Sequence, residues 1–150
     1  MQDERINNKI LYAMIVVLYI SILVVVAFKY INTNRYWKID GYDTNITAES
    51  GQDILIKARI KNKMYYVMGS DDQYFLSYHI YDETGNLIQF ENPRTYLEGI
   101  EPGSTENIDL QIKALMGKGK YRIVIDVVKE GGYWFAEKGE SPGVLYLTVD

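Results

Sequence analysis

The chain has 150 residues and a net charge of −4, with 47% hydrophobic and 24% charged residues, which is typical of a folded protein. The acidic balance argues against a nucleic-acid partner, because phosphates demand a basic face. The absence of cysteine excludes disulfides and thiolate metal sites, and the single histidine, His79, excludes a site with several histidine ligands. No cofactor is expected.

The first long feature is an uncharged apolar run from Ile10 to Phe28, ILYAMIVVLYISILVVVAF. At about 1.5 Å per helical residue, this run is close to the roughly 30 Å thickness of a bilayer's hydrocarbon core. A cleaved signal peptide would have a shorter apolar core and a small-residue cleavage site, which the sequence before Lys29 does not provide. A buried core helix would normally have a polar face. We therefore expect an uncleaved transmembrane helix over residues 10–30, after a short tail at 1–9.

After a polar linker at residues 31–36, the chain changes to short alternating runs separated by turn residues. Residues 53–63 alternate apolar and charged side chains, as in a strand with one wet face. Residues 74–82 and 87–90 flank a glycine-containing turn and predict a hairpin. Further strands, and no further helix, are expected within 36–46 and at 108–112, 121–129 and 144–149. About seven short strands predict an all-β domain over residues 37–150, an antiparallel immunoglobulin-like (Ig-like) β-sandwich.

Four residues are expected to have structural roles in this domain. Tyr121 opens a strand at the position of a tyrosine corner, whose hydroxyl bonds to upstream backbone; the alternative is a hydroxyl in water. Arg94, Asp126 and Glu130 are expected to form an ion-paired brace across the sheets. His79 alternates with inward-facing neighbours, so we expect it on the other side of its strand, at the surface or at an interface.

Four segments carry a resemblance to a known module: LSYHIYDETGN at residues 76–86, PRTYL at 93–97, EPGS at 101–104, and residues 119–139 with the element Glu-Gly-x-x-Trp-Phe. Together they resemble a prokaryotic Ig-like module that occurs beside glycosyltransferases and methyltransferases of surface-polysaccharide clusters. The chain is similar in style to the carbohydrate-binding C-terminal domain of O-antigen ABC transporters. The resemblance covers about residues 50–149 and implies an Ig-like fold that binds carbohydrate.

Two aromatic groups are the candidate binding residues. Tyr133, Trp134 and Phe135 lie between the last two strands, where exposed rings can stack on sugars or anchor a partner protein. The alternative is that Trp134 and Phe135 plug one end of the core. Tyr65 and Tyr66 lie in an apolar loop that could grip a partner, contact the membrane surface or cover the edge of the sandwich.

Motifs for chemistry are absent: we find no nucleophile with a base, phosphate-binding loop or dinucleotide fingerprint, and expect no enzymatic activity. Asp71 and Asp72 could touch a cation, but two adjacent carboxylates do not make a calcium loop. Asn45-Ile46-Thr47 fits a glycosylation acceptor.

These features predict a single-pass, signal-anchored protein of a prokaryotic cell membrane. Positive residues before and after the span nearly cancel, so charge does not decide the topology. We expect the C-terminal domain to be extracytoplasmic, because Ig-like domains on short N-terminal anchors are usually displayed outside. Its expected role is to recognise a cell-surface glycan or a partner protein of the cell envelope. The alternative is an accessory or structural subunit of a membrane-associated assembly, such as an archaeal filament stator or a secretion machine.

Overall fold

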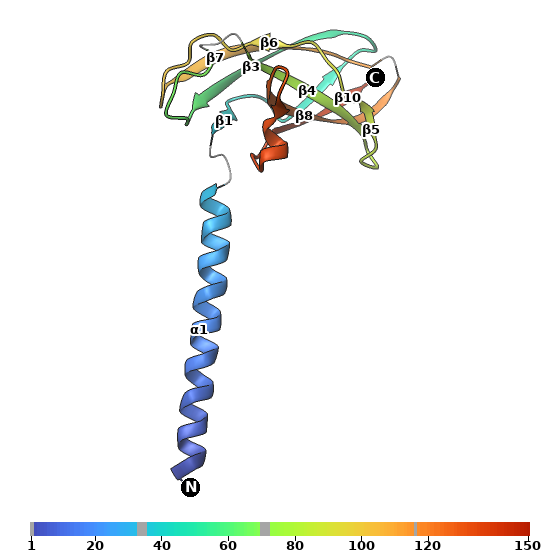
Figure 1. Cartoon of the computed structure of the whole chain (residues 1–150). Helices are drawn as coiled ribbons and strands as arrows, with labels where there is room; N and C mark the ends of the chain where they lie inside the picture. The colour runs from blue at the N-terminus through green and yellow to red at the C-terminus, as the bar shows by residue number, and fades with distance from the viewer. Residues whose placement is uncertain (1, 33–35, 70–72, 116) are drawn as a thin grey trace. The chain divides into compact units, whose positions relative to one another are not determined.

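The computed structural model describes residues 2–32, 36–69, 73–115 and 117–150, and within its long helix the side chains of residues 8–27. The chain divides into two compact units, Met1–Thr33 and Asn34–Asp150. The first contains helix α1 and the second contains every strand. Figure 1 shows the two units.

Helix α1 (Gln2–Asn32) is longer than the predicted span. It extends through most of the predicted tail at residues 1–9 and into the start of the predicted linker, because no proline or glycine interrupts these residues. Residues 33–35 of that linker lie outside the described residues. Within α1, Asn8–Ala27 has a mean hydropathy of 2.9 and is long and apolar enough to cross a membrane. None of its side chains is buried by the rest of the chain.

The second unit is built from strands and one short 3-10 helix. They are β1 (Trp37–Asp40), β2 (Asn45–Ala48), β3 (Asp53–Asn62), β4 (Tyr74–Asp82), β5 (Leu87–Gln89), β6 (Thr95–Tyr96), β7 (Thr105–Lys113), β8 (Gly119–Lys129), β9 (Tyr133–Trp134), η1 (Phe135–Lys138) and β10 (Gly143–Val149). The six predicted runs from residue 53 onward each correspond to a strand, and the stretch 36–46 contains β1 and the start of β2. The predicted strand at 108–112 begins earlier, at Thr105, and η1 was not expected, because four residues are too few to show a helical period.

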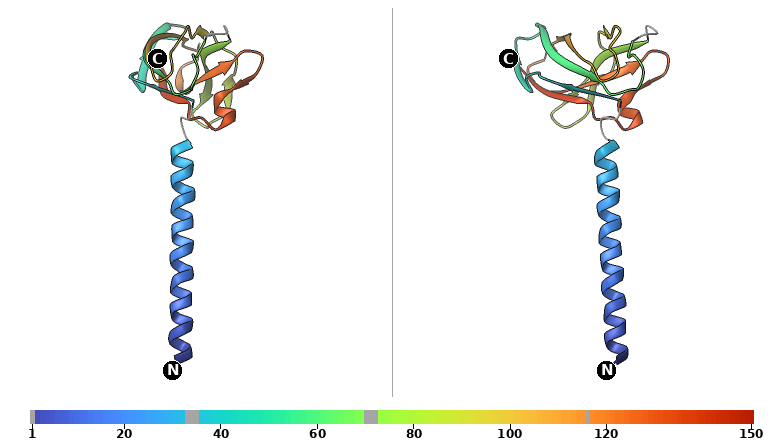
Figure 2. Two further views of the ribbon diagram at one scale, coloured as in Figure 1. Left: turned by 60° about the vertical axis from the view of Figure 1, so that its left-hand side comes forward. Right: turned by 90° about the vertical axis from the view of Figure 1, so that its left-hand side faces the viewer.

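Two sheets organise these strands (Figure 2). The small sheet has the order β1-β3-β7, and the large sheet has the order β2-β10-β8-β4-β5, with β6 paired to β4 and β9 paired to β8. Every pairing is antiparallel except β2 with β10, which is parallel. The expectation of purely antiparallel sheets is therefore wrong at this one pair. Strands β2 and β10 are joined by a long stretch of chain that contains most of the domain, and a long connection permits parallel pairing.

One hydrophobic core receives side chains from both sheets. On β3, Ile56, Ala58 and Ile60 are buried while the intervening charged residues are exposed, as their alternation predicted. Strand β4 differs from β3, because it is buried on both faces. Of its first seven residues, all but Phe75 are buried. One face of β4 contributes to the hydrophobic core. Its other face is covered at His79 by Phe90 and Trp134, which come later in the chain. That covered region, and the uncovered region beside it, position the candidate site.

Candidate binding site

The predicted aromatic group at residues 133–135 is mostly buried. Phe135 is a core residue, Tyr133 is half-buried against the core, and Trp134 retains only 8% of its exposure. The structure thus agrees with the core alternative for Phe135, whereas Trp134 is buried outside the core cluster, against His79 and Phe90. Buried rings cannot stack on a ligand without rearrangement, so Trp134 and Phe135 are structural residues here.

The second predicted group lies in the loop between β3 and β4. Tyr65 is 92% exposed, whereas Tyr66 is partly covered and its hydroxyl lies 3.3 Å from that of Tyr74. Burial of the Tyr66 hydroxyl raises its pKa, and the bond with Tyr74 raises it further. The buried side chain of Asn62 shapes the loop by donating to the carbonyl oxygen of Tyr66 and accepting from the amide of Met64. The acidic residues that follow, Asp71 and Asp72, lie outside the described residues.

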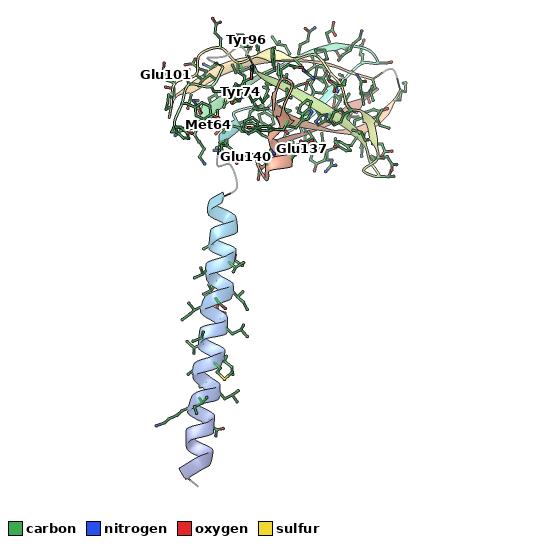
Figure 3. All side chains as sticks on the ribbon, in the orientation of Figure 1. Met64, Tyr74, Tyr96, Glu101, Glu137 and Glu140 are labelled. Carbon is green, nitrogen blue, oxygen red and sulfur yellow. The ribbon has the colours of Figure 1, made fainter. Side chains whose placement is uncertain are left out.

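Tyr65 and Tyr66 form one cluster with Tyr133 and Phe135, although nearly seventy positions separate the two pairs. Tyr74 links them, because its ring centroid lies 6.1 Å from that of Phe135 while its hydroxyl meets Tyr66. Tyr36 and Tyr133 pack on Phe135 at 5.6 Å and 5.2 Å. Figure 3 labels Tyr74 and Met64 in this region. Among the predicted binding residues, Tyr65 alone is largely exposed here.

Trp134 belongs to a separate aromatic group on the face of the large sheet that points away from the core. Its ring centroid lies 4.2 Å from that of His79 and 5.6 Å from that of Phe90. The His79 ring is also bonded through Nδ1 to the carbonyl oxygen of Phe90 at 2.7 Å. The expectation of a surface His79 is wrong, because Phe90 and Trp134 cover the face on which it was correctly placed.

The predicted brace is corrected in two respects. Arg94 pairs with Glu130 and with Glu91, and its guanidinium lies 5.9 Å from the Trp134 ring centroid. Both Arg94 and Glu130 flank strands of the large sheet, so this brace lies within one sheet and does not cross between sheets. Asp126 takes no part in it.

Asp126 instead holds the start of η1. It is buried, and its two carboxylate oxygens accept from the amides of Val127 and Ala136 at 2.8 and 2.9 Å. Burial raises the pKa of Asp126 to about 6, although both amide bonds oppose the shift, and the charges of Glu137 and Glu140 add to it. Figure 3 labels Glu137 and Glu140 on and just after η1. A raised pKa can mark a catalytic acid, but Asp126 is covered and serves as a structural acceptor.

The Tyr121 hydroxyl donates to the carbonyl oxygen of Gly117 at 2.9 Å. This is the upstream backbone bond expected of a tyrosine corner. It fixes the start of β8 at the edge of a cleft on the domain.

This cleft, of about 730 Å³, lies on the part of the large sheet's outer face that no later segment covers. Its walls come from β2, β8, β10 and the turn after β4, and are lined by Asn45, Ile46, Thr47, Asp82, Glu83, Thr84, Gly85, Lys120, Tyr121, Arg122, Tyr146, Leu147 and Thr148. Tyr146 is 55% exposed, because its neighbours Leu145 and Leu147 point into the core and the pleat turns it outward. The cleft therefore combines one exposed ring with amide, hydroxyl and cationic groups.

The turn that forms one wall is held by Asp82. Its Oδ1 accepts from the Thr84 and Asn86 amides and from the Thr84 hydroxyl, and its Oδ2 accepts from the Asn86 side chain. These bonds, chiefly from Asn86 and Thr84, lower the pKa of Asp82 to about 2. Gly85 adopts a φ of 88°, as the glycine of this turn was expected to do.

The sequence interpretation did not single out this cleft. Its outward-facing side chains on β8 and β10 are Lys120, Arg122, Tyr146 and Thr148, at alternate positions of strands that were predicted. Alternation alone does not show which strands are neighbours. The one available signal was Tyr146, an aromatic residue on the outward register of a strand. In the described residues, no group of three histidine, cysteine, aspartate or glutamate side chains is arranged to hold a metal ion.

The geometry defines a protein made of an apolar N-terminal helix and a two-sheet β unit with a polar–aromatic cleft. No protein-family model matches the sequence, and no curated protein matches it. Among solved structures, a β-glucosidase from Listeria innocua in complex with glucose matches with a TM-score of 0.47 and 11% identity. The match covers 75% of this chain and 15% of that enzyme. A CARDB domain from Pyrococcus furiosus matches with a TM-score of 0.45 and 12% identity, covering 79% of this chain and 97% of that domain. A family 123 glycoside hydrolase from Clostridium perfringens matches with a TM-score of 0.45 and 14% identity, covering 79% of this chain and 26% of that enzyme.

Proposed function

We propose that this protein is a membrane-anchored, extracytoplasmic binding module, an Ig-like β-sandwich that recognises a cell-surface glycan. The observation that carries this proposal is the cleft, in which the exposed Tyr146 ring lies among amide, hydroxyl and cationic side chains. An aromatic face packs on the apolar face of a sugar ring, while convergent polar groups bond the sugar hydroxyls and fix its orientation. The core shared by two sheets supports the sandwich assignment.

The membrane anchor is supported by the apolar Asn8–Ala27 segment, whose side chains the rest of the chain leaves exposed. A charged residue at the centre of a span costs about 2.5–3.5 kcal/mol in insertion experiments. We expect Val17→Lys combined with Leu18→Lys to move the protein from the carbonate-resistant membrane fraction to the soluble fraction. The control, Tyr65→Lys, alters an exposed loop residue and should stay in the membrane. Retention of the double variant in the membrane would contradict the anchor.

The side of the membrane can be tested because the chain has no cysteine. With Tyr65→Cys as the single thiol, an impermeant maleimide added to intact cells should label the protein fully, since this position is 92% exposed. Gln2→Cys should be labelled only after the cells are permeabilised. The reversed pattern would place the β unit in the cytoplasm.

Glycan recognition is tested with the full chain in nanodiscs, applied to an array of bacterial and archaeal surface polysaccharides. We expect retention on at least one glycan, lost in Tyr146→Ala and kept in Tyr65→Ala. Both residues are exposed, so neither variant should unfold. Loss in Tyr65→Ala alone would move the site to the loop predicted from sequence, and absence of retention would overturn the glycan assignment.

One observation favours the second candidate, a subunit of a membrane-associated assembly. Strand β5 lies at the end of the large sheet, and Leu87, Ile88 and Phe90 on and beside it are 48%, 49% and 42% exposed. An apolar edge strand is a template for strand addition by another chain. A stoichiometric complex purified from native membranes, and lost in Ile88→Lys, would support this role. A complex that survives Ile88→Lys would place the contact elsewhere.

A further inference from the structure

We infer that the glycan bound in the cleft is acidic, with its carboxylate held by Arg122 and a sugar ring stacked on Tyr146. This inference rests on the proposed glycan-binding function and names the ligand class of the same cleft. Three observations support it: the register of four strands, the contact of Arg122 with Tyr81, and the partners that Asp82 and Glu83 already have.

The strand register places four side chains in one line across the outer face of the large sheet. Asn45 on β2 is opposite Tyr146 on β10, Tyr146 is opposite Arg122 on β8, and Arg122 is opposite Tyr81 on β4. Adjacent strands are about 4.8 Å apart, so this transverse row extends about 14 Å, the length of a short oligosaccharide. A ligand lying along the row would meet an amide, a ring and a guanidinium in that order.

A second row runs beside the first. Thr47 and Thr148 are opposite each other, and Thr148 is opposite Lys120. These residues are two positions along their strands from the first row and therefore lie on the same face. The second row adds two hydroxyl groups and an ammonium group to the same cleft.

Arg122 lines the cleft, and its guanidinium forms no ion pair with a carboxylate among the described residues. Its guanidinium lies 4.7 Å from the Tyr81 ring centroid. It is half-buried. Stacking on Tyr81 restrains the guanidinium while leaving its N–H edge for a planar anion, and a guanidinium binds a carboxylate through two parallel hydrogen bonds.

The two carboxylates that line the cleft, Asp82 and Glu83, form no ion pair with Arg122 in the part of the chain that the structure describes. Asp82 already accepts four hydrogen bonds within its own turn. Glu83 faces Lys120 at 4.0 Å, and both side chains of that pair are largely exposed. Such an exposed pair contributes little and can exchange for a ligand carboxylate. Of the four residues in the first row, Arg122 is the one that carries a formal charge, and it lies opposite Tyr146.

The experiment measures binding of oligogalacturonate and of hyaluronan oligomers to the full chain in nanodiscs, by calorimetry. Each probe is compared with its carboxyl-reduced form, which keeps the sugar rings and removes the charge. We expect at least one acidic oligomer to bind ten-fold or more tightly than its reduced form. Arg122→Gln should abolish that preference, Arg122→Lys should retain part of it, and Tyr146→Ala should weaken both forms about equally. Urea unfolding of each variant checks that the fold is intact.

The outcomes separate this inference from the function on which it rests. If acidic and reduced oligomers bind equally and Tyr146→Ala weakens both, the cleft binds glycan but the acidic class is overturned. Acidic binding that survives Arg122→Gln would also overturn the role of Arg122. If none of the acidic or reduced oligomers binds, the inference fails, and the polysaccharide array then decides whether the proposed function fails with it.

Discussion

The hydroxyl groups of Tyr66 and Tyr74 lie 3.3 Å apart, and this contact ties the loop after β3 to the cluster around Phe135. A substitution of Tyr66 or Phe135 therefore alters the packing of Tyr74, which contacts both. Loss of binding in a variant of this cluster would reflect altered packing, whereas the exposed Tyr146 and Tyr65 can be changed without disturbing the core. Stability measurements must accompany every binding assay on this protein.

Trp134→Ala should lower the free energy of unfolding by about 3–5 kcal/mol, because it removes a buried ring packed on His79 and Phe90. Tyr65→Ala, at a 92% exposed position, should change it by about 0.5 kcal/mol or less. Urea unfolding followed by far-ultraviolet circular dichroism compares the two. Similar effects for both variants would mean that Trp134 is not the structural residue described above.

Asp126 should make the protein less stable as pH rises from about 4 to about 6. Its pKa of about 6 in the folded state exceeds the ordinary value of 3.8, so in this interval the folded state binds more protons than the unfolded state. The expected loss is on the order of 2–3 kcal/mol. Asp126→Asn should remove this slope. The measurement is the difference between the two pH–stability curves, which cancels the contributions of the other carboxylates.

Asp82 should behave in the opposite way. Hydrogen bonds from Asn86 and Thr84 lower its pKa to about 2, so its contribution to stability is present above about pH 4 and is lost as pH falls through 2. The carboxyl carbon resonance of Asp82 should titrate with a midpoint near pH 2. In Asn86→Ala the midpoint should rise toward 3.8. An unchanged midpoint would show that the turn bonds do not hold this carboxylate.

Gly69→Ala should destabilise the domain more than Gly85→Ala. Both glycines have a positive φ, 86° and 88°, so both substitutions strain the backbone by about 1 kcal/mol. At Gly69 an added Cβ would also lie 1.6 Å from the carbonyl oxygen of Leu97, whereas at Gly85 it meets nothing within 4 Å. Thermal unfolding should show a clearly larger drop for Gly69→Ala. Equal drops would indicate that the segment carrying Leu97 moves away at little cost.

The long strands could be predicted closely, because short apolar runs bounded by turn residues mark them even where, as in β4, both faces are buried. Residues 74–82 are both the predicted run and β4, and β3 ends one residue before its prediction. The candidate site could not be predicted in the same way. Tyr133, Trp134 and Phe135 were interpreted from composition, and composition does not show whether a loop folds outward or onto its own sheet. His79 shows the same limit. Alternation correctly placed it on the strand face away from the core, but not that Phe90 and Trp134 cover that face.

The sequence by itself determined an uncharged apolar segment of membrane-spanning length, a β domain, and the inward or outward register of each long strand. These properties follow from local composition and from the two-residue period of a strand. Only the tertiary structure decided which strands are neighbours, and so it alone aligned Asn45, Tyr146, Arg122 and Tyr81 in one row. It also separated Asp126 from Arg94. The physical reason is that pairing between strands depends on contacts between distant parts of the chain, which local periodicity does not encode.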